Sequence, residues 1–174
     1  MGAVAAGDEG ALAELLDRYE HALAHFIHRH TGGVDVDDLY QETWLRVVRA
    51  APRFDRSRRF STWMFQIAVN LCRDWHRRTR PQQIPEGFEP AAGRQPSPDA
   101  RVDASRLLAR LPEAQREVVV LRYYHDFTEA QVAEILGCPK GTVKSRMHSA
   151  MAHLGRLVDD ADVTAGEGGD DTLG

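Results

Sequence analysis

The chain has 174 residues, 43% of them hydrophobic, which suits one ordinary domain or two small ones. No apolar run approaches the ~18 residues of a membrane span, and the N-terminus has no signal-peptide pattern. The two cysteines, Cys72 and Cys138, are far apart and lack metal-binding spacing. We therefore expect a cytoplasmic protein with reduced thiols and no membrane insertion.

Charge is strongly segregated along the chain, although the net charge is only −4. Residues 1–43 carry 2 basic and 9 acidic side chains, a net charge of −7, whereas residues 44–80 carry 10 basic and 2 acidic ones, net +8. A block of that size creates a local positive field whatever the total charge is. It indicates a polyanionic partner such as nucleic acid.

The first helix is expected to run from Asp8 to just before Gly32-Gly33, because leucine and aromatic residues recur at helical spacing. Residues 1–7 are small and are expected to fray. The helix carries a histidine cluster, of which His21 and His25 are spaced to share a metal ion. No carboxylate or thiol completes a familiar site there, so we expect no metal and a structural role for the cluster, which comprises His21, His25, His28 and His30.

A second helix is predicted from Asp35, as its N-cap, to about Ala51, before Pro52. Its first turn is acidic, as the helix dipole favours. Leu39, Val47 and Val48 are assigned to the core. The polar residues around the exposed side are Asp38, Gln41, Glu42 and Arg46, and by themselves they indicate only a solvated face.

The stretch FSTWMFQIAVNLCRDWHRRTR predicts a helix over residues 60–80, capped by Ser61. One face is apolar and consists of Met64, Ile67, Ala68, Leu71 and Trp75. Another face combines an indole, two amides and two guanidinium groups, from Trp63, Gln66, Asn70, Arg73 and Arg77. Rings stack on unpaired bases, amides read base edges and arginines hold phosphates, so this face suits opened DNA better than a merely solvated basic face.

This helix also carries a carboxylate between two arginines and a cysteine one turn before a histidine. Asp74 lies between Arg73 and Arg77, where its carboxylate could orient an arginine or accept a hydrogen bond from a base amino group. Cys72 and His76 are four residues apart, which allows a metal or redox pair, but a packed thiol is the favoured interpretation.

A proline-rich linker is predicted next, because residues 81–99 contain five of the eight prolines and no periodicity. It divides the chain into an N-terminal helical domain over residues 8–80 and a C-terminal one over residues 102–158, with the linker spanning 81–101. Residues 159–174 are acidic and glycine-rich and are expected to be disordered. The fold class is all-α.

The C-terminal domain has the pattern of a helix-turn-helix. Helices are expected over residues 102–111 and from Pro112 to Tyr124; then Thr128 and Gln131 form a capping box and Gly137 supplies a left-handed turn. The helix after Pro139 would lie in the major groove. Its candidate DNA contacts are Lys140, Thr142, Lys144, Ser145, Arg146 and His148. A plain three-helix interaction domain is the alternative.

Three stretches together resemble a known family, the extracytoplasmic-function (ECF) group of bacterial RNA polymerase sigma factors. They are DVDDLYQETWLRVVRAAPRF, FSTWMFQIAVNLCRDWHRR and LPEAQREVVVLRYYHDFTEAQVAEILGCPKGTVKSRMHSA, in the order that the family has. The resemblance implies a promoter-specificity subunit that promotes transcription initiation, without catalysis or cofactor.

The resemblance also implies partners and sites. The D-x-x-Q-E helix would bind the beta-prime coiled coil of core RNA polymerase through Asp38, Leu39, Gln41 and Glu42. The minus-ten promoter element would be opened by the next helix, where Trp63, Asn70 and Asp74 match the family motif and Gln66, Arg73 and Arg77 share the surface. The G-T-V-K-S-R helix would read the minus-thirty-five element. The C-terminal domain would contact the beta flap, and an anti-sigma factor would hold the protein inactive.

The sequence departs from the family pattern at two positions, Ser149 and Met151, where arginine is usual. Losing two phosphate contacts would weaken DNA binding and flatten its salt dependence by roughly two units of slope. Two other interpretations were weighed: a free-standing helix-turn-helix repressor or activator, and a metal or thiol sensor using the histidine cluster, Cys72 and His76. An enzyme has least support, because no catalytic constellation occurs at a productive spacing.

Overall fold

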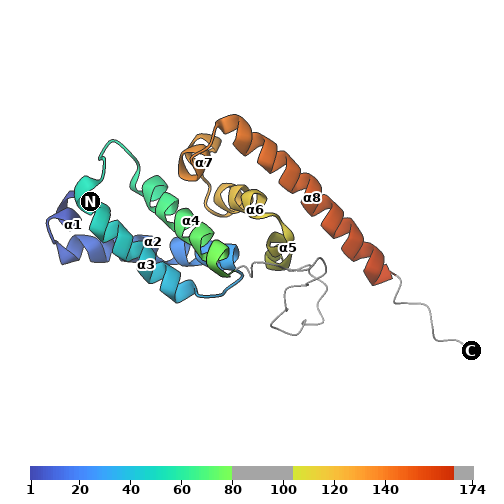
Figure 1. Cartoon of the computed structure of the whole chain (residues 1–174), viewed down its shortest axis with the longest axis horizontal. Helices are drawn as coiled ribbons and strands as arrows, with labels where there is room; N and C mark the ends of the chain where they lie inside the picture. The colour runs from blue at the N-terminus through green and yellow to red at the C-terminus, as the bar shows by residue number, and fades with distance from the viewer. Residues whose placement is uncertain (80–103, 167–174) are drawn as a thin grey trace, which may run out of the picture.

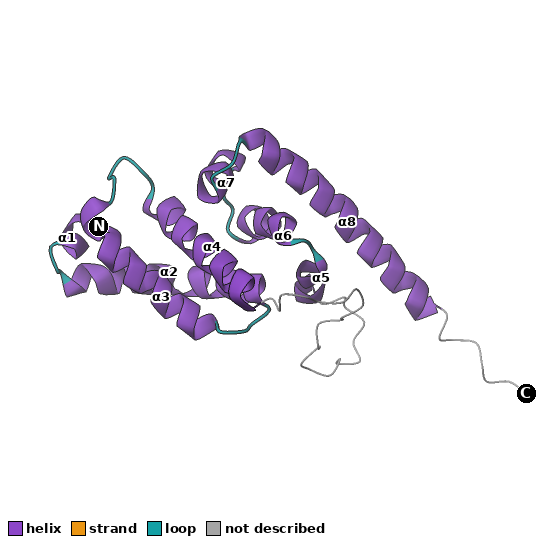
Figure 2. Ribbon diagram, viewed as in Figure 1, coloured by secondary structure: helices purple, strands orange, loops and turns teal. Residues whose placement is uncertain are grey.

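The part of this protein that the structure describes is helical. The computed structural model describes residues 1–79 and 104–166, in which no strand occurs (Figures 1 and 2). The N-terminal domain contains α1 (Gly2–Ala5), α2 (Glu9–Thr31), α3 (Val36–Ala50), a 3-10 turn η1 (Ala51–Arg53) and α4 (Phe60–Thr79). The C-terminal domain contains α5 (Ala104–Arg110), α6 (Glu113–Val119), a π-helical turn η2 (Val120–Tyr124), α7 (Glu129–Leu136) and α8 (Lys140–Gly166).

Local sequence signals set both ends of α2 and of α7. The Asp8 carboxylate accepts a hydrogen bond from the Ala11 amide, and Gly32 ends α2 in the left-handed conformation with φ 69°. At α7, Thr128 and Gln131 form the expected capping box, and Gly137 ends the helix with φ 64°. These predicted ends are confirmed, and with them the helix-turn-helix of α7 and α8.

Helix α4 lies at the centre of the molecule, between α3 on one side and α7 on the other (Figure 1). One apolar face, with Met64 and Ala68 fully buried, packs within the N-terminal domain. Phe65, Val69 and Cys72 form a second buried face, spaced i, i+4 and i+7. Buried side chains therefore form one continuous core that includes residues of both domains.

Several sequence expectations are wrong in detail. Residues 2–5 form a helix with Val4 buried instead of fraying. Ser61 is inside α4, which begins at Phe60, and Pro112 is the N-cap of α6 rather than its first residue. Val48 is 38% exposed, whereas Trp44, which had been given no role, is buried at 6%.

Asp35 occupies the N-cap position of α3, but its side chain makes no capping bond. Its backbone is left-handed, with φ 51°, and its carboxylate instead accepts a hydrogen bond of 2.8 Å from the indole Nε1 of Trp75. A contact with the distant Trp75 has thus replaced the expected capping bond of Asp35 to its own helix.

Helix α8 continues through Gly166, so the expected disorder is wrong for residues 159–166, and the end of the helix projects from the rest of the molecule (Figure 1). The predicted linker and residues 167–174 lie outside the described residues. None of the helices in the described part is long and apolar enough to cross a membrane.

Candidate nucleic-acid interface

The aromatic side chain proposed for base stacking, Trp63, is partly exposed on α4. Its ring lies 4.8 Å from that of Phe54 and 6.0 Å from that of Phe60, measured between centroids. The indole is therefore held by other aromatic rings at the edge of the core and is not buried among aliphatic side chains. The exposed part of the Trp63 indole remains available for a stacking partner.

The polar residues of the same face differ in their exposure and in their hydrogen bonds to other side chains. Asn70 and Arg77 are exposed, and Arg77 donates to Asp74 across 2.6 Å, which is one of the two roles considered for that carboxylate. Gln66 accepts a hydrogen bond of 3.1 Å from Arg58.

Arg73 is held by the C-terminal domain, although its side chain remains 33% exposed. Its Nε and one terminal nitrogen donate to the two carboxylate oxygens of Glu117 on α6, at 2.7 and 2.8 Å. The Glu117 side chain is only 1% exposed. Burial alone raises the pKa of Glu117, but the contacts with His30 and Arg73 outweigh burial and lower its pKa to about 2. A proposed phosphate-binding arginine is thus engaged inside the protein.

The polar face of α3 lies on the outside of the molecule. Asp38 and Gln41 are exposed, and Glu42 accepts a hydrogen bond of 2.8 Å from Arg46 one turn later. Leu39 is only 8% exposed and packs in the core, so in this conformation it supports the helix instead of offering a contact.

At the start of α8, most of the candidate DNA contacts are accessible. Lys140, Lys144, Ser145 and His148 are exposed, while Thr142 and Arg146 are half-buried. The Lys144 ammonium lies 3.9 Å from the Glu129 carboxylate, a loose ion pair that is easily exchanged for phosphate.

An open cavity of about 860 Å³ lies between the second half of α4 and helices α6 and α8, beside the direct contact of α4 with α7. Arg73 and Arg77 line it from α4, Glu113 and Glu117 line it from α6, and Arg146 lines it from the DNA-reading helix α8. Residues assigned to two different stretches of nucleic acid therefore line the same open cavity.

Aromatic rings form the apolar part of the contact between the domains. Phe65 on α4 is 2% exposed, with its ring centroid 5.1 Å from that of Phe127 and 4.9 Å from that of His125. The Arg29 guanidinium lies 4.0 Å from the ring centroid of Tyr124. Sequence reasoning gave Phe65 no role, although the second buried face of α4 could be read from the helical spacing of Phe65, Val69 and Cys72.

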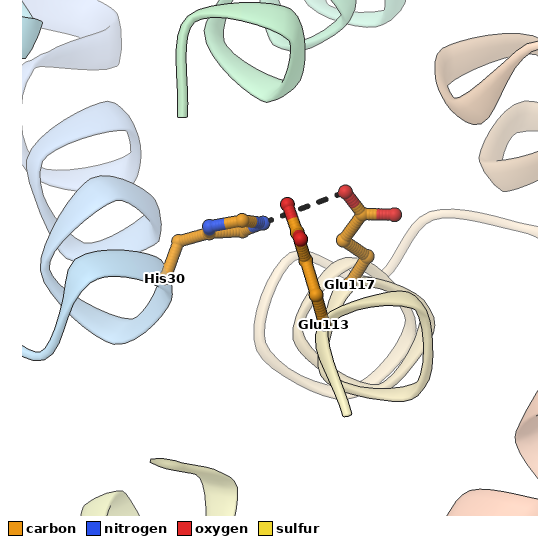
Figure 3. Close-up of side chains that lie close together, drawn as sticks. All are labelled: His30, Glu113 and Glu117. Carbon is orange, nitrogen blue, oxygen red and sulfur yellow. Dashed lines mark ion pairs between the residues drawn. The ribbon is translucent and has the colours of Figure 1, made fainter. Parts of the chain in front are cut away.

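The thiol and histidine features have a different arrangement from the one considered. Cys72 is fully buried, and desolvation together with the negative charges of Glu117 and Glu113 raises its pKa to about 12. Such a thiol is a poor nucleophile or redox sensor. Of the clustered histidines, His30 alone is buried, and it meets Glu113 and Glu117 from the other domain (Figure 3).

Comparison with known proteins covers both domains. Residues 15–82 match the family described as Sigma-70 region 2, and residues 101–154 match Sigma-70, region 4. The chain is 35% identical to the ECF RNA polymerase sigma factor SigM of Mycobacterium tuberculosis, over 91% of this chain and 82% of that protein. It is 30% identical to the ECF sigma-E factor of Escherichia coli, over 83% and 84% of the two chains.

Two solved structures are similar over most of their length. CnrH, in complex with the cytosolic domain of CnrY, has a TM-score of 0.71 and 30% identity, over 91% of this chain and 94% of that one. RpoE of Bartonella quintana, in complex with the anti-sigma factor NepR, has a TM-score of 0.65 and 25% identity, over 84% and 96%.

Proposed function

Because this chain belongs to the ECF group of RNA polymerase sigma factors, we propose that the packed arrangement of its two domains is the inactive form of a transcription-initiation subunit. As a sigma factor it binds core RNA polymerase and recognises the minus-ten and minus-thirty-five promoter elements.

We assign core-polymerase binding to the exposed face of α3, centred on Asp38, Gln41 and Glu42. Minus-ten recognition is assigned to α4, where Trp63 stacks on an unpaired base, Asn70 contacts a base edge, and Arg73 and Arg77 hold the backbone. Minus-thirty-five recognition is assigned to α8. Its exposed start supports this, and Arg146 is suited to bidentate contact with guanine.

One observation carries the assignment of an inactive state: Arg73 and Arg146 line the same cavity. The two promoter elements are about 25 base pairs apart, or roughly 85 Å along B-form DNA at ~34 Å per 10 base pairs. Residues that share one cavity cannot reach both elements together. The domains must therefore separate when the protein engages polymerase and promoter, and Arg73 must leave Glu117.

Separation exposes apolar surface, so it needs a partner. Core polymerase is that partner, because it binds the two domains at separate places, the beta-prime coiled coil and the beta flap. An anti-sigma factor would act in the opposite direction. It would bind the packed form and so increase the share of molecules in that pre-existing state. RpoE of Bartonella quintana, a structural relative, was solved with an anti-sigma factor, which supports expecting such a partner here.

The protein is proposed to act in the cytoplasm, where the polymerase is, and to have no catalytic activity of its own. A free-standing repressor would differ in one measurable way. It would bind its DNA site tightly without polymerase, whereas this sigma factor is expected to give a sequence-specific gel shift only together with core enzyme.

The minus-ten assignment is tested by Trp63→Ala and Asn70→Ala in transcription reactions with core polymerase. Both variants should bind core enzyme as the wild type does, and both should lose open-complex formation as measured by permanganate reactivity of unpaired thymines. Asn70 is exposed, so its truncation leaves the packing of α4 intact.

Glu14→Ala serves as the matched control, because Glu14 is exposed on α2 and, among the described residues, its ion pair is with Arg18 one turn away. It should open promoters normally. Normal promoter opening by Asn70→Ala and Trp63→Ala would remove this face from the mechanism, and failure of the wild type to bind core enzyme would overturn the proposed function itself.

A further inference from the structure

We propose that His30, Glu113 and Glu117 form a binding site for a divalent transition-metal ion of the zinc class at the contact between the two domains. His30 comes from α2, and the two glutamates lie one turn apart on α6 (Figure 3). The carboxylate of Glu113 and that of Glu117 both project towards the His30 ring (Figure 3).

Distances within the cluster suit a metal ion. One ligand atom from each residue can be chosen so that all three lie within 4.8 Å of one another. The Nε2 atom of His30 is 3.6 Å from Oε1 of Glu117, which is too long for a hydrogen bond. Zinc bonds of about 2.0–2.1 Å in a tetrahedron place ligand atoms roughly 3.3 Å apart, so His30 and Glu117 are already near this spacing and the widest pair must close by at most roughly 1.5 Å.

The strongest indication is that polar atoms of the cluster are buried without a hydrogen-bond partner, although His30 and Glu117 lie within ion-pair distance. His30 has no exposed surface, and neither ring nitrogen finds a hydrogen-bond partner among residues 1–79 and 104–166. Oε1 of Glu113 is likewise buried and unpaired within the same described ranges. Buried polar groups are nearly always satisfied, and a cation between these atoms would satisfy an imidazole nitrogen and a carboxylate oxygen together.

The nearby cations leave room for a metal ion. Arg73 binds Glu117, but a carboxylate oxygen carries a second lone pair, so Oε1 can accept the guanidinium and still ligate a metal. Arg116 directs its guanidinium to the Ala109 carbonyl and to His76. His76 lies beside the cluster, with its Nε2 atom 3.0 Å from the backbone oxygen of His30.

The ligand types select the ion. One imidazole with two carboxylates suits zinc and its first-row neighbours, with a water molecule completing four-coordination. Magnesium prefers six oxygen ligands in an octahedron, so a set of ligands that includes an imidazole nitrogen favours zinc over magnesium.

Because the ligands come from both domains, the site is complete only when the domains are packed together. Metal binding must therefore stabilise the packed form by mass action. If that form is inactive, as proposed above, the ion lowers the amount of factor able to bind core polymerase. This last consequence rests on the proposed function, whereas the site itself does not.

The test uses the full-length protein, freed of metal by chelation and titrated with Zn²⁺ against a chromophoric zinc chelator. We expect one zinc ion to bind per chain. Mg²⁺ should compete only weakly with Zn²⁺ for the site. Glu113→Gln should lower zinc affinity at least tenfold, because loss of even an outer partner of a zinc ligand costs about 10–100-fold. Co²⁺ in place of Zn²⁺ should give the visible absorption bands of a four-coordinate site, and Glu113→Gln should lose them.

Glu113→Gln preserves shape at a partly exposed position, so it tests a ligand and not the fold. His21→Gln is the matched control, because it removes an exposed histidine of the same helix and should leave zinc affinity unchanged. Zinc affinity that is equal in wild type and Glu113→Gln, or that disappears in His21→Gln, would overturn the site. A wild type that initiates transcription but binds no zinc would overturn this inference and leave the proposed function standing.

Discussion

His125 is the residue whose ionisation most clearly depends on the packing of the two domains. Its ring lies between Phe26 and Phe65 of the N-terminal domain, with centroid distances of 5.8 and 4.9 Å. Burial, together with the charges of Arg29 and His25, lowers its pKa to about 4 against the opposing effect of Asp126. The packed protein therefore keeps this imidazole neutral.

A partly buried histidine that stays neutral makes stability depend on pH in a defined direction. Between pH 6.5 and 4 the unfolded chain binds a proton at His125 and the folded chain does not, so stability falls as the pH falls through this range. The loss reaches about 3 kcal/mol at pH 4 and becomes negligible above about pH 7. We predict that His125→Phe flattens this part of the profile in urea unfolding followed from pH 7 to pH 4.

The exposed His148 gives the control for that measurement, since His148→Gln removes a histidine without changing the contact between the domains. It should keep the wild-type slope. Parallel stability profiles for wild type and His125→Phe would contradict the role assigned to His125.

At the scale of single elements, the turn between α7 and α8 is the most constrained feature of the C-terminal domain. Gly137 has φ 64°, a conformation that side chains other than glycine rarely adopt. A Cβ atom added there would meet no heavy atom of the described residues within 4 Å. The cost of a side chain at this position is thus conformational and not steric crowding.

We predict that Gly137→Ala destabilises the protein by about 1 kcal/mol, because alanine must adopt the left-handed conformation. Gly155→Ala should have the opposite sign, a gain of roughly 0.5–1 kcal/mol, because Gly155 lies inside α8 with open space around it. Thermal unfolding of the two variants beside wild type measures both. Equal melting temperatures for the two alanine variants would show that Gly137 does not need its conformation.

For the whole molecule, the domains are held together by apolar contact more than by surface charge. The Arg58–Glu134 pair joins them at 2.8 Å, but its side chains are 32% and 43% exposed. An exposed pair of this kind contributes about 0.2–1 kcal/mol. Truncating a buried phenylalanine costs about 3–5 kcal/mol, so the ring of Phe127 against Phe65 outweighs the ion pair.

Phe127→Ala is therefore predicted to open the molecule, and Arg58→Ala is not. Small-angle X-ray scattering should show a larger radius of gyration for Phe127→Ala while its helical circular dichroism signal is retained. Phe127→Leu, which keeps most of the apolar volume, should restore the compact form. A radius of gyration that grows in Arg58→Ala and stays constant in Phe127→Ala would reverse the order of these contributions.

Much of this protein could be predicted from the sequence because the signals are local. Helical periodicity, the Asp8 cap, the Thr128–Gln131 box and Gly137 each act within a few residues, so the helices and the helix-turn-helix are where they were expected. The family resemblance rests on motifs within single helices, and the comparisons confirm it. The roles of individual site residues stay predictions.

Only the tertiary structure decided how the two domains meet. Arg73 and Glu117 are 44 residues apart and His30 and Glu117 are further still, with no local pattern that pairs them. Asp35 shows the same limit, since a distant indole replaced its expected capping bond. Periodicity tells which side chains lie on one face of a helix, but what covers that face depends on the packing of distant segments, and in this protein that packing brings the cavity, the aromatic contact and the His30 cluster into being.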